Sequence, residues 1–363
     1  MLTAMKDEFI GRLQKYGMKN PYRVKKIMED VIASYRLNLD NLVVFTEAAS
    51  KNWVVTPIIA ALAGAKVFAV TYDSKYGSFK QVKDYTDCFA EFCGVEENIS
   101  VINDKNQKII NQANIITNLG FVRPINKSLI EMMNERAVIP LMYESWEFRD
   151  SDLDIKSCEE NGILVMATNE EAPELNLFKY CGLLCLKMLF KLDLEVNGNN
   201  ILIVSSDKFG IKLSTFLRAQ GAKVKLIKSF KNYTNQEELS EYDTIIIADY
   251  ISKGVIIGDD TAQINSDRIN ENTSIIQFAG DVDIHRLKKA KIPFYPKKRL
   301  GNSRMGMTFA DLGPKPLIEL NSAGLKVGEL MARARLRGMT VDESKRLVLK
   351  HPFAQEITNS QNY

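Results

Sequence analysis

Short apolar runs alternate with helical segments along most of the chain. In the first half, the apolar runs that predict strands lie at 42–45, 66–71, 114–117, 137–142 and 163–166. Because these runs are continuously apolar, they are typical of strands buried on both faces, as in a parallel sheet covered by helices. The first forty residues also predict helix, since Val31, Ile32 and Tyr35 have helical spacing. The first half is therefore predicted to be an α/β domain that follows a helical segment.

The same pattern restarts after a long apolar helix at 175–192 and a polar turn at 196–200. A helix is predicted at 210–219, and the predicted strands of this half lie at 201–204, 223–227, 244–248, 274–278 and 292–295. The final helix begins near Pro316, where proline suits the first helical turn, and Gly338 provides its stop. The second half therefore repeats the plan of the first.

These patterns predict an α/β fold of two three-layer α/β domains with parallel sheets, the second Rossmann-like. The predicted organisation is an N-terminal helical segment at 1–40, a flavodoxin-like substrate domain at 41–195, a Rossmann-like nucleotide domain at 196–315 and C-terminal helices at 316–363. We expect the C-terminal helices to cross back onto the substrate domain.

Composition narrows the function classes. The 48 basic and 45 acidic residues give a formal net charge of +3, which provides no electrostatic footprint for nucleic acid or an anionic membrane. No secretory leader pattern opens the sequence, and the five cysteines form no CxxC pair. With two histidines, the chain has few ligands for zinc. We expect a cytoplasmic protein without a metal, whose partner is a small molecule.

Polar residues follow several predicted strands of the first half. In open parallel sheets ligands bind beyond the carboxyl ends of the strands, so these residues are candidates for substrate binding: Glu47, Asp73, Arg123, Arg149, Asn169 and Glu170. In the segment YESWEFRD, Arg149 is suited to hold a substrate carboxylate, and Glu144 or Glu147 to act as general base. The alternatives are helix caps for the strand-end residues and a surface ion pair between Arg149 and a glutamate.

The stretch ILIVSSDKFG at 201–210 has the outline of a strand that enters a helix through a phosphate-binding turn. The glycine positions of such a turn are Ser205, Asp207 and Gly210, so only the packing glycine is kept. A carboxylate at Asp207 would bind the free N–H groups of the helix and repel pyrophosphate. The candidate cofactor residues are Ser205, Ser206, Asp207, Lys208, Phe209, Gly210, Lys228, Ser229 and Asp249.

The end of the next strand bears on the choice of cofactor. NAD-specific sites usually present an acid there, whereas this chain has Lys228 and Ser229. Basic and hydroxyl groups suit a 2′-phosphate, so NADP is favoured over NAD if either binds.

Over roughly 110–330, the order of elements resembles the D-2-hydroxyacid dehydrogenase superfamily, the formate/glycerate dehydrogenase-like proteins. The segments that carry the resemblance are ANIITNLGFVRPINKSLIEMM, DLDIKSCEENGILVMATNE and ILIVSSDKFGIKLSTFLRAQGAKV. The resemblance implies an NAD(P)-dependent oxidoreductase that acts on a small polar metabolite bearing carboxylate or amino groups, bound between the domains, and a homodimer.

The family's catalytic arginine and histidine in the second domain have no match in DYISKGVIIGDD or GPKPLIELNSAGLKVG. The remaining candidates for the acid–base residue are Glu144, Lys326 and Tyr250. The alternative hypothesis is a diverged, non-redox protein on the same scaffold: a small-molecule binding protein, a lyase or a hydrolase.

Overall fold

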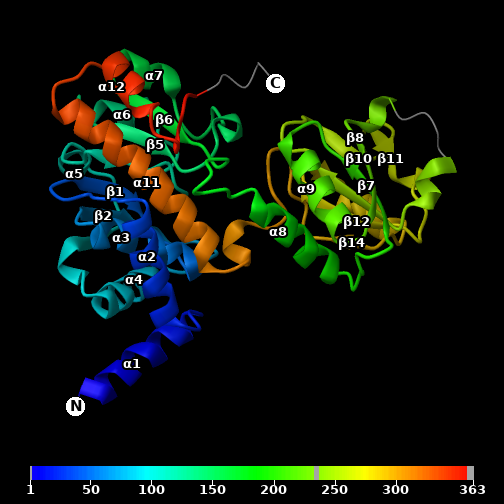
Figure 1. The fold of residues 1–363 in the computed structure, drawn as a ribbon, viewed down its shortest axis with the longest axis horizontal. Helices are drawn as coiled ribbons and strands as arrows, with labels where there is room; N and C mark the ends of the chain where they lie inside the picture. The colour runs from blue at the N-terminus through cyan, green and yellow to red at the C-terminus, as the bar shows by residue number, and fades with distance from the viewer. Residues whose placement is uncertain (1, 233–236, 358–363) are drawn as a thin grey trace. The chain divides into compact units, whose positions relative to one another are not determined.

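The computed structural model describes residues 2–232 and 237–357, which form two compact units. Unit 1 consists of Met1–Asn176 and Gly313–Tyr363, and unit 2 consists of Leu177–Leu312 (Figure 1). Each unit has a parallel sheet between two covering layers, so the predicted fold class is confirmed. No helix within the described ranges combines the length and apolar character needed to cross a lipid bilayer.

The sheet of unit 1 has seven strands in the order β15-β6-β5-β4-β1-β2-β3. Their bounds are β1 Val43–Glu47, β2 Lys66–Val70, β3 Ile99–Ile102, β4 Ile115–Ile116, β5 Val138–Leu141, β6 Leu164–Thr168 and β15 Ala354–Gln355. The first six strands are parallel and have the spatial order 3-2-1-4-5-6. This is the order of a dinucleotide-binding sheet and differs from the order 2-1-3-4-5 of flavodoxin. The sequence pattern named this half flavodoxin-like without predicting which strands are neighbours. The switch point of unit 1 therefore lies between β1 and β4.

Helices cover both faces of this sheet. One face carries α2 Pro21–Ser34, α3 Val55–Leu62, α4 Phe79–Cys93, α11 Pro314–Leu336 and α12 Val341–Val348; the other carries α5 Gln107–Ile110, α6 Lys127–Glu131 and α7 Ile155–Glu160. Helix α1, Leu2–Lys15, contacts α4.

Helix α11 lies across the sheet of unit 1, as Figure 1 shows in orange. Its glycines allow the close approach, because a Cβ atom at Gly324 would lie 2.5 Å from Sδ of Met142 and one at Gly328 would lie 3.0 Å from Ile115. The expected crossing of the final helix onto the first half is therefore present, and it begins at Pro314.

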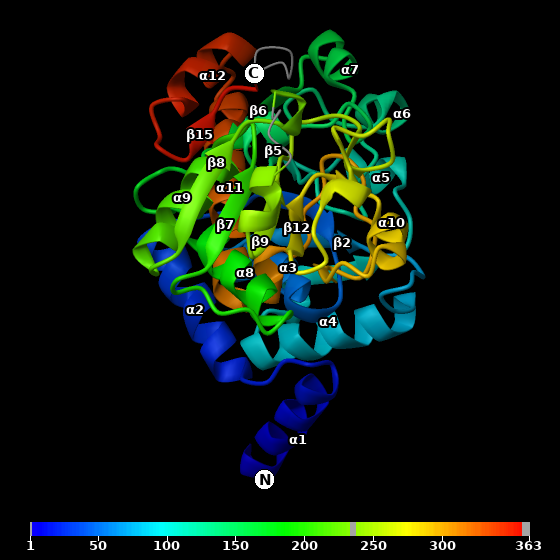
Figure 2. The ribbon, with the colours of Figure 1, turned by 90° about the vertical axis from the view of Figure 1, so that its right-hand side faces the viewer.

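The main sheet of unit 2 is parallel and has the order β14-β12-β9-β7-β8. Its strands are β7 Asn200–Val204, β8 Lys223–Ile227, β9 Thr244–Ala248, β12 Ser274–Ala279 and β14 Phe294–Tyr295. Figure 2 shows β8, β7, β9 and β12 side by side. The chain leaves β7 for β8 on one side and returns to β9 on the other, so the switch point of unit 2 lies between β7 and β9.

Helices α8, Lys179–Phe190, and α9, Lys208–Ala219, pack together over one face of this sheet. The other face is covered by α10, Ile284–Lys289, and by a small sheet that the sequence pattern did not predict: β10 Val255–Gly258, β11 Ile264–Asn265 and β13 Asp281–Val282. A Cβ atom at Gly182 of α8 would lie 2.2 Å from the ring of Phe216 in α9. Because α8 packs this closely on α9, unit 2 begins at Leu177 and not at 196.

Candidate functional site

The turn between β7 and α9 contains the predicted cofactor residues. Asp207 is the N-cap residue of α9, and its Oδ1 accepts the N–H of Phe209 at 2.9 Å. Its Oδ2 accepts the N–H of Tyr250, which follows β9, at 2.6 Å. The hydroxyl of Ser205 donates to Oδ1 at 3.1 Å. The carboxylate of Asp207 thus joins the turn after β7 to the loop after β9, and we call this set of contacts the Asp207 bridge.

The carboxylate of Asp249 also joins the turn after β7 to the loop after β9. Asp249 is fully buried, and its Oδ1 accepts the hydroxyl of Ser206 at 2.9 Å. The hydroxyl of Ser252 donates to Oδ2 of Asp249 at 2.6 Å. The crevice in which an open α/β sheet binds its ligand is therefore spanned here by side chains of the protein itself.

Gly210 keeps its packing role. A Cβ atom at Gly210 would lie 2.6 Å from Cβ of Ser205 and 2.8 Å from Cδ1 of Leu226, so only glycine fits without a shift. The N–H of Gly210 donates to Oγ of Ser205 at 3.0 Å. The strand–turn–helix geometry predicted for 201–210 is therefore intact.

The residues of this turn do not fit a pyrophosphate group. A pyrophosphate at this turn would need the free N–H groups at the start of α9, and Asp207 already accepts one of them. Burial raises the pKa of Asp207 to about 6, although the N–H groups of Tyr250 and Phe209 oppose the shift. At neutral pH the group is ionised, so it places a negative charge where a phosphate would bind.

The other predicted cofactor residues have structural contacts or lie in solvent. Phe209 packs against Phe278 with ring centroids 5.3 Å apart. The Nζ of Lys208 lies 6.0 Å from the ring centroid of Phe178. Lys228 is exposed, and the hydroxyl of Ser229 donates to Gln263 at 2.7 Å. None of these described contacts forms a pocket for a 2′-phosphate.

The raised pKa of Asp207 predicts a pH-dependent contribution to stability. A carboxyl group whose pKa is higher in the folded state stabilises the fold fully below its unfolded pKa of about 3.9, and loses that contribution as pH rises to about 6. We expect the unfolding free energy of the wild type, relative to Asp207→Asn, to fall by up to about 3 kcal/mol between pH 4 and pH 7. Urea unfolding followed by far-ultraviolet circular dichroism measures it. A difference that stays constant with pH would contradict the assignment.

The switch point of unit 1 has a similar arrangement. Glu47, the last residue of β1, is buried, and its carboxylate accepts the N–H groups of Gly120 and Phe121 from the loop after β4; the bond to Phe121 is 3.0 Å. Burial raises the pKa of Glu47, while Phe121, Arg123 and Gly120 oppose the shift. We call this the Glu47 bridge. In both units, then, a carboxylate from the first strand or its turn binds the loop that follows the strand across the switch point.

Two predicted substrate residues come together beside the Glu47 bridge. Arg123 and Arg149 both bind Oδ2 of Asp152, with Nη1 of Arg123 and Nη2 of Arg149 each 2.6 Å away. The alternative considered for Arg149 was an ion pair with a glutamate; the structure shows an ion pair with Asp152. Asp152 was not predicted from the sequence; it lies three residues after Arg149 in the same turn after β5.

The other predicted substrate residues hold chain segments in place. Asp73 accepts the N–H of Phe79 at the start of α4, at 2.6 Å. Asn169 donates through Nδ2 to the carbonyl of Pro352 at 3.0 Å. The N–H of Glu170 donates to Glu144 at 2.8 Å. These contacts match the alternative considered for strand-end residues, in which their polar groups serve caps and loops.

The three candidates for the acid–base residue come from both units. Glu144 is fully buried after β5 and also accepts Nε2 of Gln355 at 3.2 Å. Lys326 in α11 donates to the carbonyl of Arg36 at 2.7 Å, before the amino end of β1. Tyr250 is buried in unit 2. We interpret the contacts of Lys326 as structural, because its Nζ also lies 2.9 Å from Glu329.

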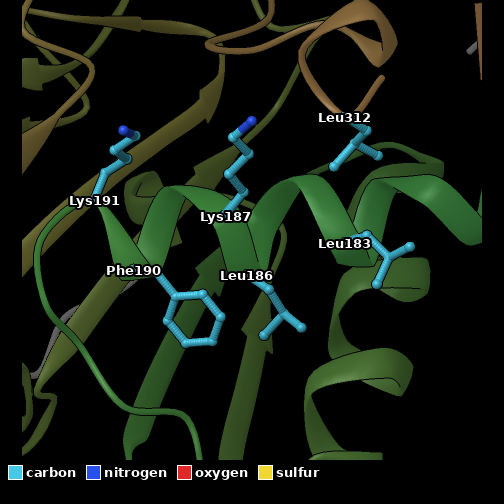
Figure 3. Close-up of a pocket in the computed structure, with 6 residues that line it drawn as sticks. All are labelled: Leu183, Leu186, Lys187, Phe190, Lys191 and Leu312. Atoms are coloured by element: carbon cyan, nitrogen blue, oxygen red, sulfur yellow. The ribbon is translucent and has the colours of Figure 1, made fainter. Parts of the chain in front are cut away.

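A hollow of about 460 Å³ lies on the outer surface of α8 (Figure 3). Its lining is mostly apolar and is formed by Leu183, Leu186, Lys187, Phe190, Lys191 and Leu312. None of these is a predicted site residue. A small polar metabolite would find little to bind there, so we do not assign the substrate to it. In the ranges that the structure describes, no group of three or more His, Cys, Asp or Glu residues is arranged to hold a metal ion.

The structure is similar to that of a dipicolinate synthase polypeptide from Bacillus halodurans, with a TM-score of 0.50 and 12% sequence identity over 82% of this chain and 99% of that chain. A dipicolinate synthase polypeptide from Bacillus subtilis matches with a TM-score of 0.47 and 11% identity over 85% and 99% of the two chains. NAD+-bound 3-phosphoglycerate dehydrogenase from Entamoeba histolytica matches with a TM-score of 0.46 and 13% identity over 82% and 96%.

No protein-family model matches the sequence, and no curated protein matches it. The structural similarity to the dipicolinate synthase polypeptide from Bacillus halodurans shows that the chain has the same two-domain α/β fold. The resemblance to the D-2-hydroxyacid dehydrogenase superfamily is confirmed at the level of the fold.

Proposed function

We propose that the protein is a diverged, non-redox member of this fold that binds a small polar metabolite through unit 1. The Asp207 bridge carries the proposal. Its carboxylate accepts the N–H groups of Phe209 and Tyr250, and it adds a negative charge at the start of α9. A dinucleotide would have to displace this carboxylate and overcome the like charge.

The location in unit 1 rests on where its charged groups lie. Glu47 comes from the end of β1, and Arg123 and Arg149 come from the loops after β4 and β5. These positions lie at the carboxyl ends of the strands, where α/β proteins bind ligands. The oxidoreductase hypothesis is supported by the fold alone, and a fold hosts many functions. The side chains that would carry hydride chemistry in the second unit have no counterpart in this sequence.

The test is a titration of the purified chain with NADH and with NADPH. Both coenzymes are used because Lys228 and Ser229 follow β8, where a 2′-phosphate would be recognised. At about 1 mM coenzyme, a site with a Kd of about 10 μM would stabilise the protein by about 2.7 kcal/mol. We expect no change in Tm and no enhancement of nicotinamide fluorescence. A saturable response to either coenzyme would restore the oxidoreductase hypothesis.

A further inference from the structure

Arg123 and Arg149 converge on one oxygen of a single carboxylate. Arg149 binds Oδ2 of Asp152 through Nε at 2.9 Å and through Nη2 at 2.6 Å, whereas Arg123 binds it through Nη1 alone. The side chains of Arg123, Arg149 and Asp152 are 25%, 20% and 14% exposed, so part of each side chain is accessible to solutes. Oδ1 of Asp152 has a long contact of 3.4 Å to the hydroxyl of Ser151.

The charged groups of this triad are two guanidinium groups and one carboxylate. Burial alone would raise the pKa of Asp152, but Arg123 and Arg149 outweigh it and hold that pKa below its usual range. The carboxylate is therefore ionised, and one negative charge faces two guanidinium groups. Lys105 is a further cation near Arg123, because its Nζ donates to the carbonyl of Val122, the residue before Arg123, at 2.7 Å. Glu47 is a further carboxylate within electrostatic reach of Arg123, and backbone N–H groups already bind it.

The hydroxyl of Tyr143 is the second observation. It is buried and has no hydrogen-bond partner among the described residues, which is uncommon for a buried phenol. Burial is the main cause that raises the pKa of Tyr143 to about 12, and the charge of Asp152 raises it further. Arg123 and Arg149 lower this pKa, and Glu147 raises it more weakly. Tyr143 lies in the same segment after β5 as Arg149 and Asp152, and its O–H donor lacks an acceptor in the described chain.

We propose that Arg123, Arg149 and Tyr143 form a binding site for the oxyanion group of a small molecule, a carboxylate or a phosphate, and that Asp152 occupies the arginines until the ligand binds. The inference deepens the proposed function and rests on it, since it names the ligand group that unit 1 recognises. Guanidinium groups hold such oxyanions through paired N–H donors, and the phenol supplies one more donor to an acceptor oxygen.

The experiment uses the full chain, with sodium malonate and inorganic phosphate as probes and sodium chloride at equal ionic strength as the control for screening. Tm and isothermal titration calorimetry are measured for the wild type and for Arg123→Gln, Tyr143→Phe and Asp152→Asn. Arg136→Gln is the matched control, because Arg136 is a half-exposed arginine in a surface ion pair with Glu135. The relative affinities for malonate and phosphate identify the group.

We expect at least one probe to raise the Tm of the wild type beyond the effect of chloride, and Arg123→Gln to abolish this rise. Tyr143→Phe should fold as stably as the wild type without a probe, since its hydroxyl has no partner to lose in the described chain, yet bind the probe at least threefold more weakly. Asp152→Asn should bind it about tenfold more tightly, because it keeps the shape and removes the competing charge. Arg136→Gln should behave as the wild type.

Equal responses to both probes and to chloride in the wild type and in Asp152→Asn would overturn the inference. So would a Tyr143→Phe variant whose probe affinity equals that of the wild type. These measurements contain no coenzyme, so their failure is distinct from the failure of the proposed function, which a saturable response to NADH or NADPH would show.

Discussion

Replacing Asp207 with glycine is expected to increase the affinity of the protein for a dinucleotide. The change removes the carboxylate that accepts the N–H groups of Phe209 and Tyr250, and with it the negative charge at the start of α9. Glycine is also the residue that the phosphate-binding turn uses at this position. We expect NADH or NADPH to bind Asp207→Gly at least tenfold more tightly than the wild type, which corresponds to about 1.4 kcal/mol. Nicotinamide fluorescence and calorimetry measure the affinity.

The matched control is Asp207→Asn, which removes the charge and keeps the side chain in the turn. If charge repulsion alone excludes pyrophosphate, both variants gain affinity; if the side chain also fills the space, only the glycine variant gains it. Glycine is a tolerated N-cap, at a cost of a few tenths of a kcal/mol, so both variants should fold. A glycine variant that is folded by circular dichroism and binds no better than the wild type would refute the role of the Asp207 bridge.

Replacing Lys326 with methionine is expected to destabilise unit 1 strongly. Lys326 is 8% exposed, and its Nζ lies 2.9 Å from Glu329 and 2.7 Å from the carbonyl of Arg36. Arg36 has a left-handed backbone with a φ of 49°, which these contacts hold at the end of α2. Loss of the ammonium leaves the buried Glu329 with the N–H of Asn38 at 3.0 Å and a longer contact of 3.6 Å to Arg333. We expect a loss of about 3 kcal/mol in the free energy of unfolding, because a buried charge loses its closest partner.

Tryptophan fluorescence during urea unfolding measures this loss, because both tryptophans, Trp53 and Trp146, lie in unit 1. The control is Lys127→Met, which removes one half of an exposed ion pair with Glu131 and should change stability by less than about 0.5 kcal/mol. A Lys326→Met variant as stable as the wild type would contradict the structural role. It would also return Lys326 to the candidates for catalysis, since catalytic groups are commonly removed without loss of stability.

Much of the architecture follows from local patterns. Continuous apolar runs predicted buried parallel strands, and β8 at Lys223–Ile227 and β9 at Thr244–Ala248 have the predicted bounds. The stretch 201–210 predicted a strand, a turn and a helix, and Gly210 has the packing role expected of it. These predictions are correct because apolar periodicity, proline and glycine affect the conformation of the chain within a few residues of their own position.

Features that depend on distant residues were missed or misplaced. The pair of β15 with β6 joins Ala354 to Thr168, and the small sheet of unit 2 pairs Val255 with Asp281. The strand order of unit 1 was not predicted, because the sequence shows which segments are strands and not which strands are neighbours. Lys326 was predicted as an acid–base candidate, and its bond to Arg36 spans most of the chain.

By itself, the sequence determined that the chain forms two α/β units, that the turn after β7 keeps its geometry, and that Asp207 stands where a phosphate-binding turn needs glycine. Tertiary structure alone decided what Asp207 binds, since its second acceptor bond comes from Tyr250 in the loop after β9. It also decided that Arg123 and Arg149 share Asp152. The physical reason is that hydrogen bonds and ion pairs depend on distances in space, which the chain acquires only when its strands are ordered into a sheet.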